Sequence, residues 1–199
     1  MVYLIGASGH AKVIIEILED HKIEIGGLHD SNPEIKSLLG YEVFEEFPTS
    51  FNPNKDKIII SVGNNAVRKK LASSNIYKFI SVCHINTSIS NRSTIGEGTV
   101  IMAGVSINSS CEIGNHVIIN TNASIDHDCI LKDYVHISPN VALAGNVKIG
   151  EGAHIGIGAC IIQGTKIGKW CTIGAGAVII NDVPDGATIV GNPGRIIKI

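Results

Sequence analysis

The stretch "IGEGAHIGIGACIIQGTKIGKWCTIGAG" (Ile149–Gly176) repeats with a period of six residues. An isoleucine opens each hexad, glycine often follows it, and the fifth position holds a small residue. A six-residue period fits neither an α-helix nor a β-hairpin and is typical of a parallel β-helix. The sequence therefore predicts a solenoid of short strands in this part of the chain.

The same period extends back to residue 89 without an insertion. Every first position from Ile89 to Ile173 is Ile or Leu, and every fifth position is small or β-branched. Three hexads make one triangular coil, so residues 18 apart should stack about 4.8 Å apart, the spacing of neighbouring strands. We expect the first and fifth positions to point inward and the second-position glycines to permit turns. Three cysteines occupy the small fifth position and should be core residues: Cys111, Cys129 and Cys171.

Residues 1–84 follow a different pattern, in which short strands alternate with helices. Strands are expected at 2–5, 22–30 and 57–60, helices at 11–20 and 66–74, and a looser excursion at 32–56. This alternation predicts a small parallel sheet covered by helices. The chain is thus divided into a Rossmann-like α/β domain (1–84) and an all-β parallel β-helix (85–199).

Polar turns follow each of the three expected strands. Ligands of such sheets lie beyond the carboxyl ends of the strands, where glycines allow backbone amides to approach phosphates. The three turns therefore predict a nucleotide-sugar site. Its candidate residues are Ser8, Gly9 and His10 after the first strand, His29 and Asp30 after the second, and Gly63, Asn64 and Asn65 after the third.

The composition excludes several functions. The chain has 16 Lys+Arg against 18 Asp+Glu, which provides no basic field for nucleic acid. No apolar run approaches the length of a membrane-spanning helix, and the N-terminus lacks the basic start of a signal peptide. Five cysteines without a pairing pattern indicate reduced thiols. We therefore expect a cytoplasmic protein without membrane insertion.

The segment "SIDHDCILKD" (124–133) interrupts the repeat with a histidine between two acids. His127 takes an outward third position, and a carboxylate on one ring nitrogen would fix its tautomer and raise its basicity. The pattern alone leaves open whether Asp126 or Asp128 does this. Such a histidine is suited to general-base catalysis. Gly145 lies 18 residues further on, so its backbone N–H is a candidate donor to an oxyanion.

A second histidine, His136, lies nine residues beyond His127, half a coil around. The two should therefore not face one groove within a single chain. Ile157 and Ala175 are 18 residues apart and stack on the edge that carries His136. An active site between two neighbouring chains would bring both edges together.

The motifs "GASGHAKV", "GNNAVRKK", "DHDC", "HISPNVALAGNVKIG" and "VGNPGR" together resemble one family of bacterial sugar acetyltransferases. It includes the sialic acid O-acetyltransferases (NeuD-like) and the N-acetyltransferases of nucleotide-linked 4-amino-4,6-dideoxy sugars (PglD-like). The resemblance implies a left-handed β-helix, a homotrimer, and acetyl-CoA as co-substrate without a metal. It assigns the general base to His127, oriented by the next residue, which is usually Glu and here is Asp128. It also assigns acetyl-CoA binding to His136, Gly145, Ile157 and Ala175.

The leading hypothesis is acetyl-CoA-dependent N-acetylation of the 4-amino group of a nucleotide-linked 4-amino-4,6-dideoxy sugar. The first alternative is O-acetylation of sialic acid or another sugar. Two remoter alternatives are a non-catalytic β-helix binding module and a zinc hydratase of the γ-carbonic-anhydrase kind, with His127, His136 and His154 as ligands. For the outward histidines His116 and His154 we otherwise expect solvated positions.

Overall fold

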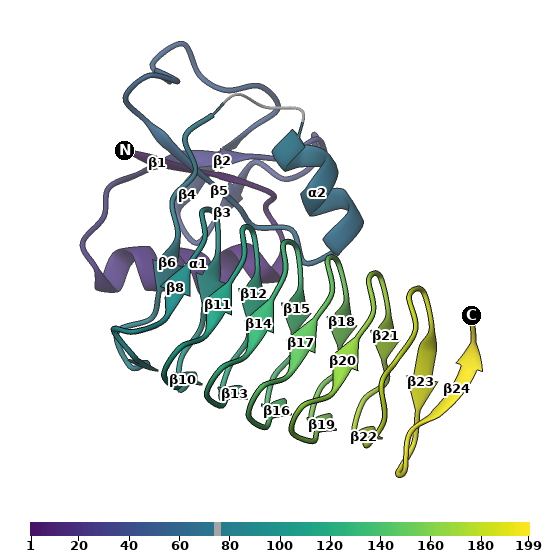
Figure 1. The fold of residues 1–199 in the computed structure, drawn as a ribbon. Coiled ribbons are helices and arrows are strands. Elements are labelled where there is room, and N and C mark those ends of the chain that lie inside the picture. The colour runs from purple at the N-terminus through teal and green to yellow at the C-terminus, as the bar shows by residue number, and fades with distance from the viewer. Residues whose placement is uncertain (74–76) are drawn as a thin grey trace.

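The structure, a computed structural model, describes residues 1–73 and 77–199. A small α/β domain lies beside the first coils of a long β-helix, and the later coils continue past it to the C-terminus (Figure 1). The predicted fold class, an α/β domain followed by a parallel β-helix, is confirmed. No described helix has the length and apolar character needed to cross a membrane.

The N-terminal domain contains a five-stranded sheet of order β3-β4-β2-β1-β5. Its strands are parallel except β3, which pairs antiparallel with β4. The helix α1 buries Ala11, Ile14, Ile15, Ile17 and Leu18 completely. The elements are β1 (Val2–Ile5), α1 (Gly9–Asp20), β2 (Ile25–His29), β3 (Ser37–Leu38), β4 (Tyr41–Phe44), β5 (Lys57–Ile60) and α2 (Asn65–Ser73).

The segment 32–56 differs from the expected loose excursion. It contains the β3–β4 hairpin, and β4 extends the sheet by pairing with β2. The burial of Val43 explains this pairing, because the strand covers apolar surface that a loop would leave open. The second predicted helix is found as α2, and its expected last residue, Ser74, lies outside the described residues.

The β-helix has three parallel sheets of two-residue strands, closed at its C-terminal end by a hairpin. The docking sheet, whose earlier strands the N-terminal domain packs against, contains β6 (Val82–Cys83), β9 (Val100–Ile101), β12 (Ile118–Ile119), β15 (His136–Ile137), β18 (His154–Ile155), β21 (Thr172–Ile173), β23 (Thr188–Val190) and β24 (Arg195–Lys198). The β13 sheet contains β7 (Ser88–Ile89), β10 (Ser106–Ile107), β13 (Ser124–Ile125), β16 (Ala142–Leu143), β19 (Cys160–Ile161) and β22 (Val178–Ile179). The β14 sheet contains β8 (Thr94–Ile95), β11 (Glu112–Ile113), β14 (Ile130–Leu131), β17 (Lys148–Ile149) and β20 (Lys166–Ile167).

The register of the coils follows the predicted 18-residue stack. Ile107 pairs with Ile125 and Ile125 with Leu143 in neighbouring strands. The first-position side chains from Ile101 onward form one continuous buried core with the small fifth-position residues. The β-helix begins slightly before the predicted boundary between residues 84 and 85, because β6 already pairs with β9.

The second-position glycines have a different role from the one expected. A Cβ on Gly114 would lie 2.8 Å from the backbone nitrogen of Asp133 in the next coil, and the backbone of Gly114 is not left-handed. The left-handed turn residues occupy the fourth position instead, for example Asn122 with a φ of 57°. The second-position glycines therefore leave room for the neighbouring coil, and the fourth-position residues adopt the left-handed turn conformation.

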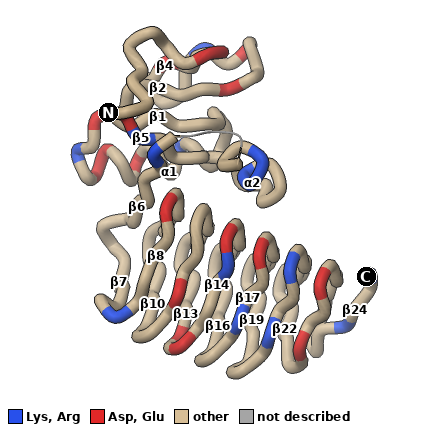
Figure 2. Tube along the Cα trace, turned by 45° about the horizontal axis from the view of Figure 1, so that its top comes forward, with Lys and Arg blue, Asp and Glu red and all other residues tan. Residues whose placement is uncertain are grey.

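Contacts of α1 and of α2 attach the N-terminal domain to the β-helix. The apolar face of α1 shares a core cluster with Val100, Met102 and Ile118 of the docking sheet. The helix α2 carries the basic run Arg68–Lys70 and lies along one corner of the coils (Figure 2). There the Lys69 Nζ pairs with Glu151 and lies 5.9 Å from the ring centroid of Tyr134 and 5.3 Å from that of Trp170.

Candidate active site

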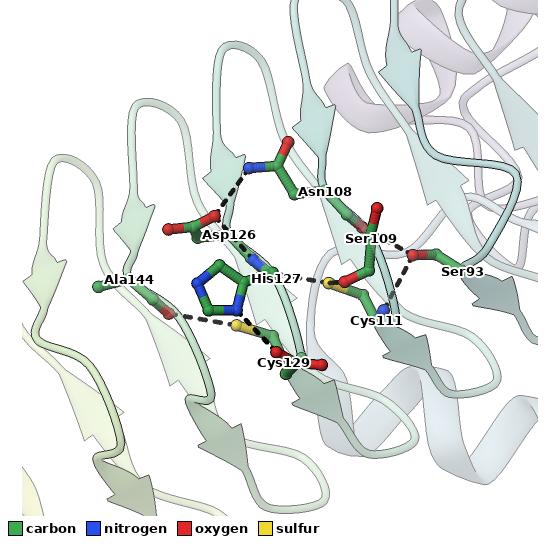
Figure 3. A network of polar contacts seen from close by, with 9 residues as sticks. Ser93, Asn108, Ser109, Cys111, Asp126, His127, Cys129 and Ala144 are labelled. Carbon is green, nitrogen blue, oxygen red and sulfur yellow. Dashed lines mark hydrogen bonds and ion pairs between the residues drawn. The ribbon is translucent and has the colours of Figure 1, made fainter.

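His127 lies at the corner that follows β13, with its side chain 59 % exposed (Figure 3). Its Nδ1 is 2.7 Å from Oδ2 of Asp128. This hydrogen bond, with a smaller contribution from the charge of Asp126, raises the pKa of His127 above its ordinary value. With Nδ1 held by a carboxylate, Nε2 is the nitrogen that can accept a proton from a substrate.

The structure distinguishes the two acids. Oδ1 of Asp126 accepts hydrogen bonds from the His127 backbone nitrogen and from Nδ2 of Asn108, each 2.8 Å long. Asp126 thus shapes the turn, and Asp128 contacts the ring. Asp128 has a φ of 60°, a left-handed conformation that Asp tolerates better than most residues. The shorter side chain at this position reaches the imidazole without difficulty.

Gly145 stacks directly against the His127 ring. A Cβ at this position would lie 2.6 Å from Cε1 and 2.7 Å from Nε2 of His127. The missing side chain therefore gives the imidazole its space. No described residue accepts a hydrogen bond from the Gly145 amide, so that amide can still donate to an oxyanion, and this role stays a prediction.

A polar groove of about 380 Å³ lies beside His127 on the β13 sheet. Its walls include Ser90, Asn108 and Ser109, and the two serine hydroxyls are 3.4 Å apart. These hydroxyl and amide groups can hydrogen-bond a polar molecule next to the His127 ring.

A second groove of about 500 Å³ lies between the two domains and is called the interdomain groove below. His136 and His154 stack on its floor with ring centroids 4.8 Å apart and an interplanar angle of 2°. The Ser138 hydroxyl is 3.0 Å from Nε2 of His154. The residues lining this groove are Gly63, Asn64, Asn65, Ala66, His136, Gly152, His154, Trp170, Cys171 and Thr172.

His136 is held in its neutral form. Burial lowers its pKa to about 3, helped by the proximity of His154 and Arg68, while the backbone of Gly63 acts weakly in the opposite direction. Both ring nitrogens are buried, and neither makes a hydrogen bond of good geometry with a described residue. A neutral imidazole with free nitrogens can still donate to, or accept from, a ligand in the groove.

The remaining predicted cofactor residues lie where the repeat implied. Ile157 and Ala175 are exposed at the corner after β18 and β21, between the docking sheet and the β13 sheet. His127 lies on a different corner, after β13, so one chain does not bring it to the edge that carries His136, Ile157 and Ala175. Within the described ranges, no group of three His, Cys, Asp or Glu side chains is arranged to hold a metal ion.

Two of the three predicted nucleotide turns line cavities, and these are different cavities; Ser8, Gly9 and His10 of the first turn line neither of them. His29 and Asp30 line a smaller cavity of about 190 Å³ together with Gly6. Oδ2 of Asp30 accepts a hydrogen bond of 2.7 Å from the Ala7 backbone and joins two of the turns. The third turn, Gly63–Asn65, faces the interdomain groove instead.

Several residues of these turns also stabilise the fold. Oδ1 of Asn64 accepts a hydrogen bond from the backbone of Val67 in the first turn of α2, and Nδ2 of Asn65 donates to the Gly152 carbonyl. Ser8 precedes α1 without a capping side-chain bond, and Gly9 begins that helix. Burial lowers the pKa of His10 to about 4, and its Nε2 is buried without a partner among the described residues.

The prediction for His116 was wrong. Its side chain faces outward from the coil, but the N-terminal domain covers it, and it is only 5 % exposed. The ring is edge-on to Phe79 and parallel to Tyr134, with centroids 4.6 and 5.5 Å away. The prediction for His154 is confirmed, because this side chain is exposed; its Nε2 lies 3.0 Å from the Ser138 hydroxyl. The 18-residue spacings of the pairs His116–Tyr134 and His136–His154 could have revealed both stacks.

Two family models match the chain. Residues 1–74 match the PglD N-terminal domain, and residues 92–127 and 146–181 match the bacterial transferase hexapeptide model of six repeats. Both matches follow the domain division seen in the structure.

Solved structures resemble the whole chain. GDP-perosamine N-acetyltransferase from Caulobacter crescentus, a histidine-to-alanine mutant in complex with CoA and GDP-perosamine, is 34 % identical with a TM-score of 0.93, over 100 % of this chain and 97 % of that one. The acetyltransferase domain of PglB from Neisseria gonorrhoeae is 36 % identical with a TM-score of 0.90, over 98 % of both chains.

A curated relative matches over a shorter range. UDP-N-acetylbacillosamine N-acetyltransferase from Bacillus subtilis is 39 % identical over 112 residues, which cover 51 % of this chain. The chain also spans 51 % of the length of that relative.

Proposed function

Because the chain belongs to the PglD-like family of hexapeptide-repeat acetyltransferases, we propose that it N-acetylates a nucleotide-linked amino sugar with acetyl-CoA. The acceptor is the 4-amino group of a 4-amino-4,6-dideoxy sugar. N-acetylation is preferred to O-acetylation because the relatives are an N-acetyltransferase of GDP-perosamine and one named for UDP-N-acetylbacillosamine. The observation that carries the proposal is the hydrogen-bonded pair of His127 and Asp128 beside Gly145.

The proposed reaction is a direct transfer. The sugar amine attacks the thioester carbonyl carbon while Nε2 of His127 removes a proton from the amine nitrogen. The C–N bond forms, the C–S bond breaks, and the electron pair leaves with the sulfur of CoA. The resulting thiolate takes up the proton from the imidazolium, which Asp128 stabilises until then. The Gly145 amide is the proposed donor to the oxyanion of the tetrahedral intermediate.

The proposed active site forms between neighbouring chains of a homotrimer. Within one chain, His127 and the His136 edge lie on different parts of the coil, so a second copy has to complete the site. Exposed apolar side chains on the later coils, among them Ile157, Ile162 and Ile180, support this assembly. His136, Ile157 and Ala175 would hold acetyl-CoA there. Light scattering should give three times the 21.1 kDa mass of the chain, and a monomer would contradict a shared site.

The proposed nucleotide-sugar site comprises the turns at Ser8–His10, His29–Asp30 and Gly63–Asn65. The proposed location is the cytoplasm, because the cysteines are free thiols and acetyl-CoA is the proposed co-substrate.

The substrate is tested by incubating the purified protein with acetyl-CoA and a panel of acceptors. The panel holds UDP-, dTDP- and GDP-linked 4-amino-4,6-dideoxy sugars, the matching 4-hydroxy sugars as controls, and free sialic acid. Mass spectrometry should find an added acetyl group on one of the amino sugars and none on its 4-hydroxy control. Acetylation of sialic acid alone would establish the O-acetyltransferase instead, and no CoA release with any acceptor would favour a binding module.

A further inference from the structure

Arg68 is the largest fully buried side chain of the described residues, at 1 % exposure. It lies in α2, yet its guanidinium reaches both domains. Nε donates to the carbonyl of His116 over 2.7 Å. Nη1 donates to Val62 and Gly63 carbonyls at 3.1 and 3.2 Å, and Nη2 to Oδ1 of Asn65 at 2.9 Å and to the carbonyls of Tyr134 and Val135 at 2.8 and 3.4 Å.

All of these acceptors are uncharged. In the part of the chain that the structure describes, no carboxylate forms an ion pair with Arg68. A buried charge without a counter-ion is costly, and here only oriented carbonyl and amide dipoles offset the cost. Burial accordingly lowers the pKa of Arg68 to about 10. An apolar side chain would fill the space at a lower desolvation cost. The guanidinium is therefore expected to have a role that depends on its hydrogen bonds.

The acceptors indicate what that role is. On one side the planar guanidinium donates hydrogen bonds to the Gly63–Asn65 turn. On the other side it donates to the carbonyls of His116 and Tyr134, which belong to two coils of the β-helix. The Gly63–Asn65 turn forms one wall of the interdomain groove. The floor of the groove is formed by His136 and His154, which lie on neighbouring coils of the β-helix. The rigid fork of donors can bind both sides at once, which the compact ammonium of a lysine cannot.

We propose that Arg68 is a positioning residue that fixes the Gly63–Asn65 turn over the His136–His154 floor and thereby sets the shape of that wall of the interdomain groove, where the acceptor sugar would bind. The identity of that acceptor rests on the proposed function, whereas the positioning role does not.

The charge of Arg68 has a second effect on the groove. His136 faces His10 from α1, His154 from β18 and Arg68 from α2, and all three neighbours disfavour its protonation. The pKa values of His10, His116 and His154 are also lowered, in each case first by burial and then by Arg68. The floor of the groove is therefore neutral at physiological pH.

Two variants separate the geometry from the charge. Arg68→Lys keeps a cation but loses the fork, and Arg68→Met loses both. In both variants the KM for the nucleotide sugar should rise about tenfold or more, and kcat/KM should fall by up to about 10²-fold, because the groove wall moves. In NMR titrations the pKa of His136 should stay low in Arg68→Lys and rise in Arg68→Met, since only the latter removes the charge. Lys70→Met, which removes an exposed cation of the same helix, should resemble the wild type in every measurement.

Amide hydrogen exchange gives a readout that needs no substrate. The amide of Val67, which donates to Oδ1 of Asn64 in the turn, should exchange faster in Arg68→Lys than in the wild type, while core amides such as that of Ile137 should not change. The proposal is overturned if a folded Arg68→Lys protein keeps both the wild-type exchange of the Val67 amide and the wild-type KM. If the wild type acetylates no acceptor, the proposed function fails, but faster exchange of the Val67 amide would still support the positioning role.

Discussion

Gly145→Ala tests whether this glycine acts by leaving room for the imidazole of His127, the proposed general base. The new Cβ would start 2.6 Å from Cε1 of His127, whereas ordinary contacts begin at 3.4 Å. The ring must therefore move by about 0.8 Å, in a coil whose backbone is held by the hydrogen bond of Asn146 to the His127 carbonyl. A displacement of about 1 Å in a catalytic group can cost about 10²-fold in rate. We expect kcat to fall by about that factor.

The backbone amide is unchanged by this substitution, so the experiment separates the two roles of Gly145. A donor to the oxyanion would survive in the alanine variant, but the space for the ring would not. The assay is steady-state acetyl transfer to the amino-sugar acceptor, with the melting temperature as a check on folding. Because the His127 ring is exposed, its displacement should change stability little.

The double variant His127→Ala/Gly145→Ala is the matched control. If Gly145 acts through the ring, adding Gly145→Ala to His127→Ala should cause no further loss, because the ring is already gone. Full activity of Gly145→Ala would refute the steric argument. A large further loss in the double variant would refute it as well, since the alanine would then disturb something other than the imidazole.

Three further predictions concern the same coil and its core. His127→Ala should lower kcat by about two to four orders of magnitude with little change in the KM for acetyl-CoA, and near-normal turnover would mean that another group is the base. Asp128→Asn should lower the pKa of His127 and so move the acidic limb of the kcat/KM profile to lower pH; an unmoved limb in rate measurements across pH would contradict the role of the hydrogen bond. A thiol reagent should label the exposed Cys160 quickly without denaturant, and mass spectrometry should find the buried cysteines unlabelled in the same period, namely Cys111, Cys129 and Cys171. Burial raises the pKa of each of these three thiols, that of Cys129 to about 11.

The coils could be predicted residue by residue because every repeat obeys the same local rule. A first-position aliphatic such as Ile125 contacts its equivalents 18 residues before and after it, so the period alone defines its neighbours. The corner histidine could be recognised for the same reason, since His127 departs from the rule. The sequence pattern left open whether Asp126 or Asp128 is the hydrogen-bond partner of the imidazole. The left-handed turn at Asp128 decides this, because it brings that carboxylate to the ring.

The contact between the domains could not be predicted in this way. Arg68 meets His116 and Tyr134 across 48 and 66 residues, and no period relates them. The pattern shows that a side chain leaves the coil but not whether another domain covers it. His116 was therefore expected in solvent although it is buried.

The contacts between α2 and the coils have a consequence for mechanical unfolding. The helix contacts His116, Tyr134, Glu151 and Trp170, which lie on successive turns at one corner of the solenoid. A repeat array loses its coils one after another from an end, because each coil is supported only by its neighbours. The helix fastens the N-terminal turns together, so the array can unravel only from the C-terminal hairpin. Pulled by its ends in optical tweezers, the chain should lengthen first by about 100 Å, the contour length of the extended residues 171–199 that follow Trp170. The turns under α2 should then give way together at a higher force.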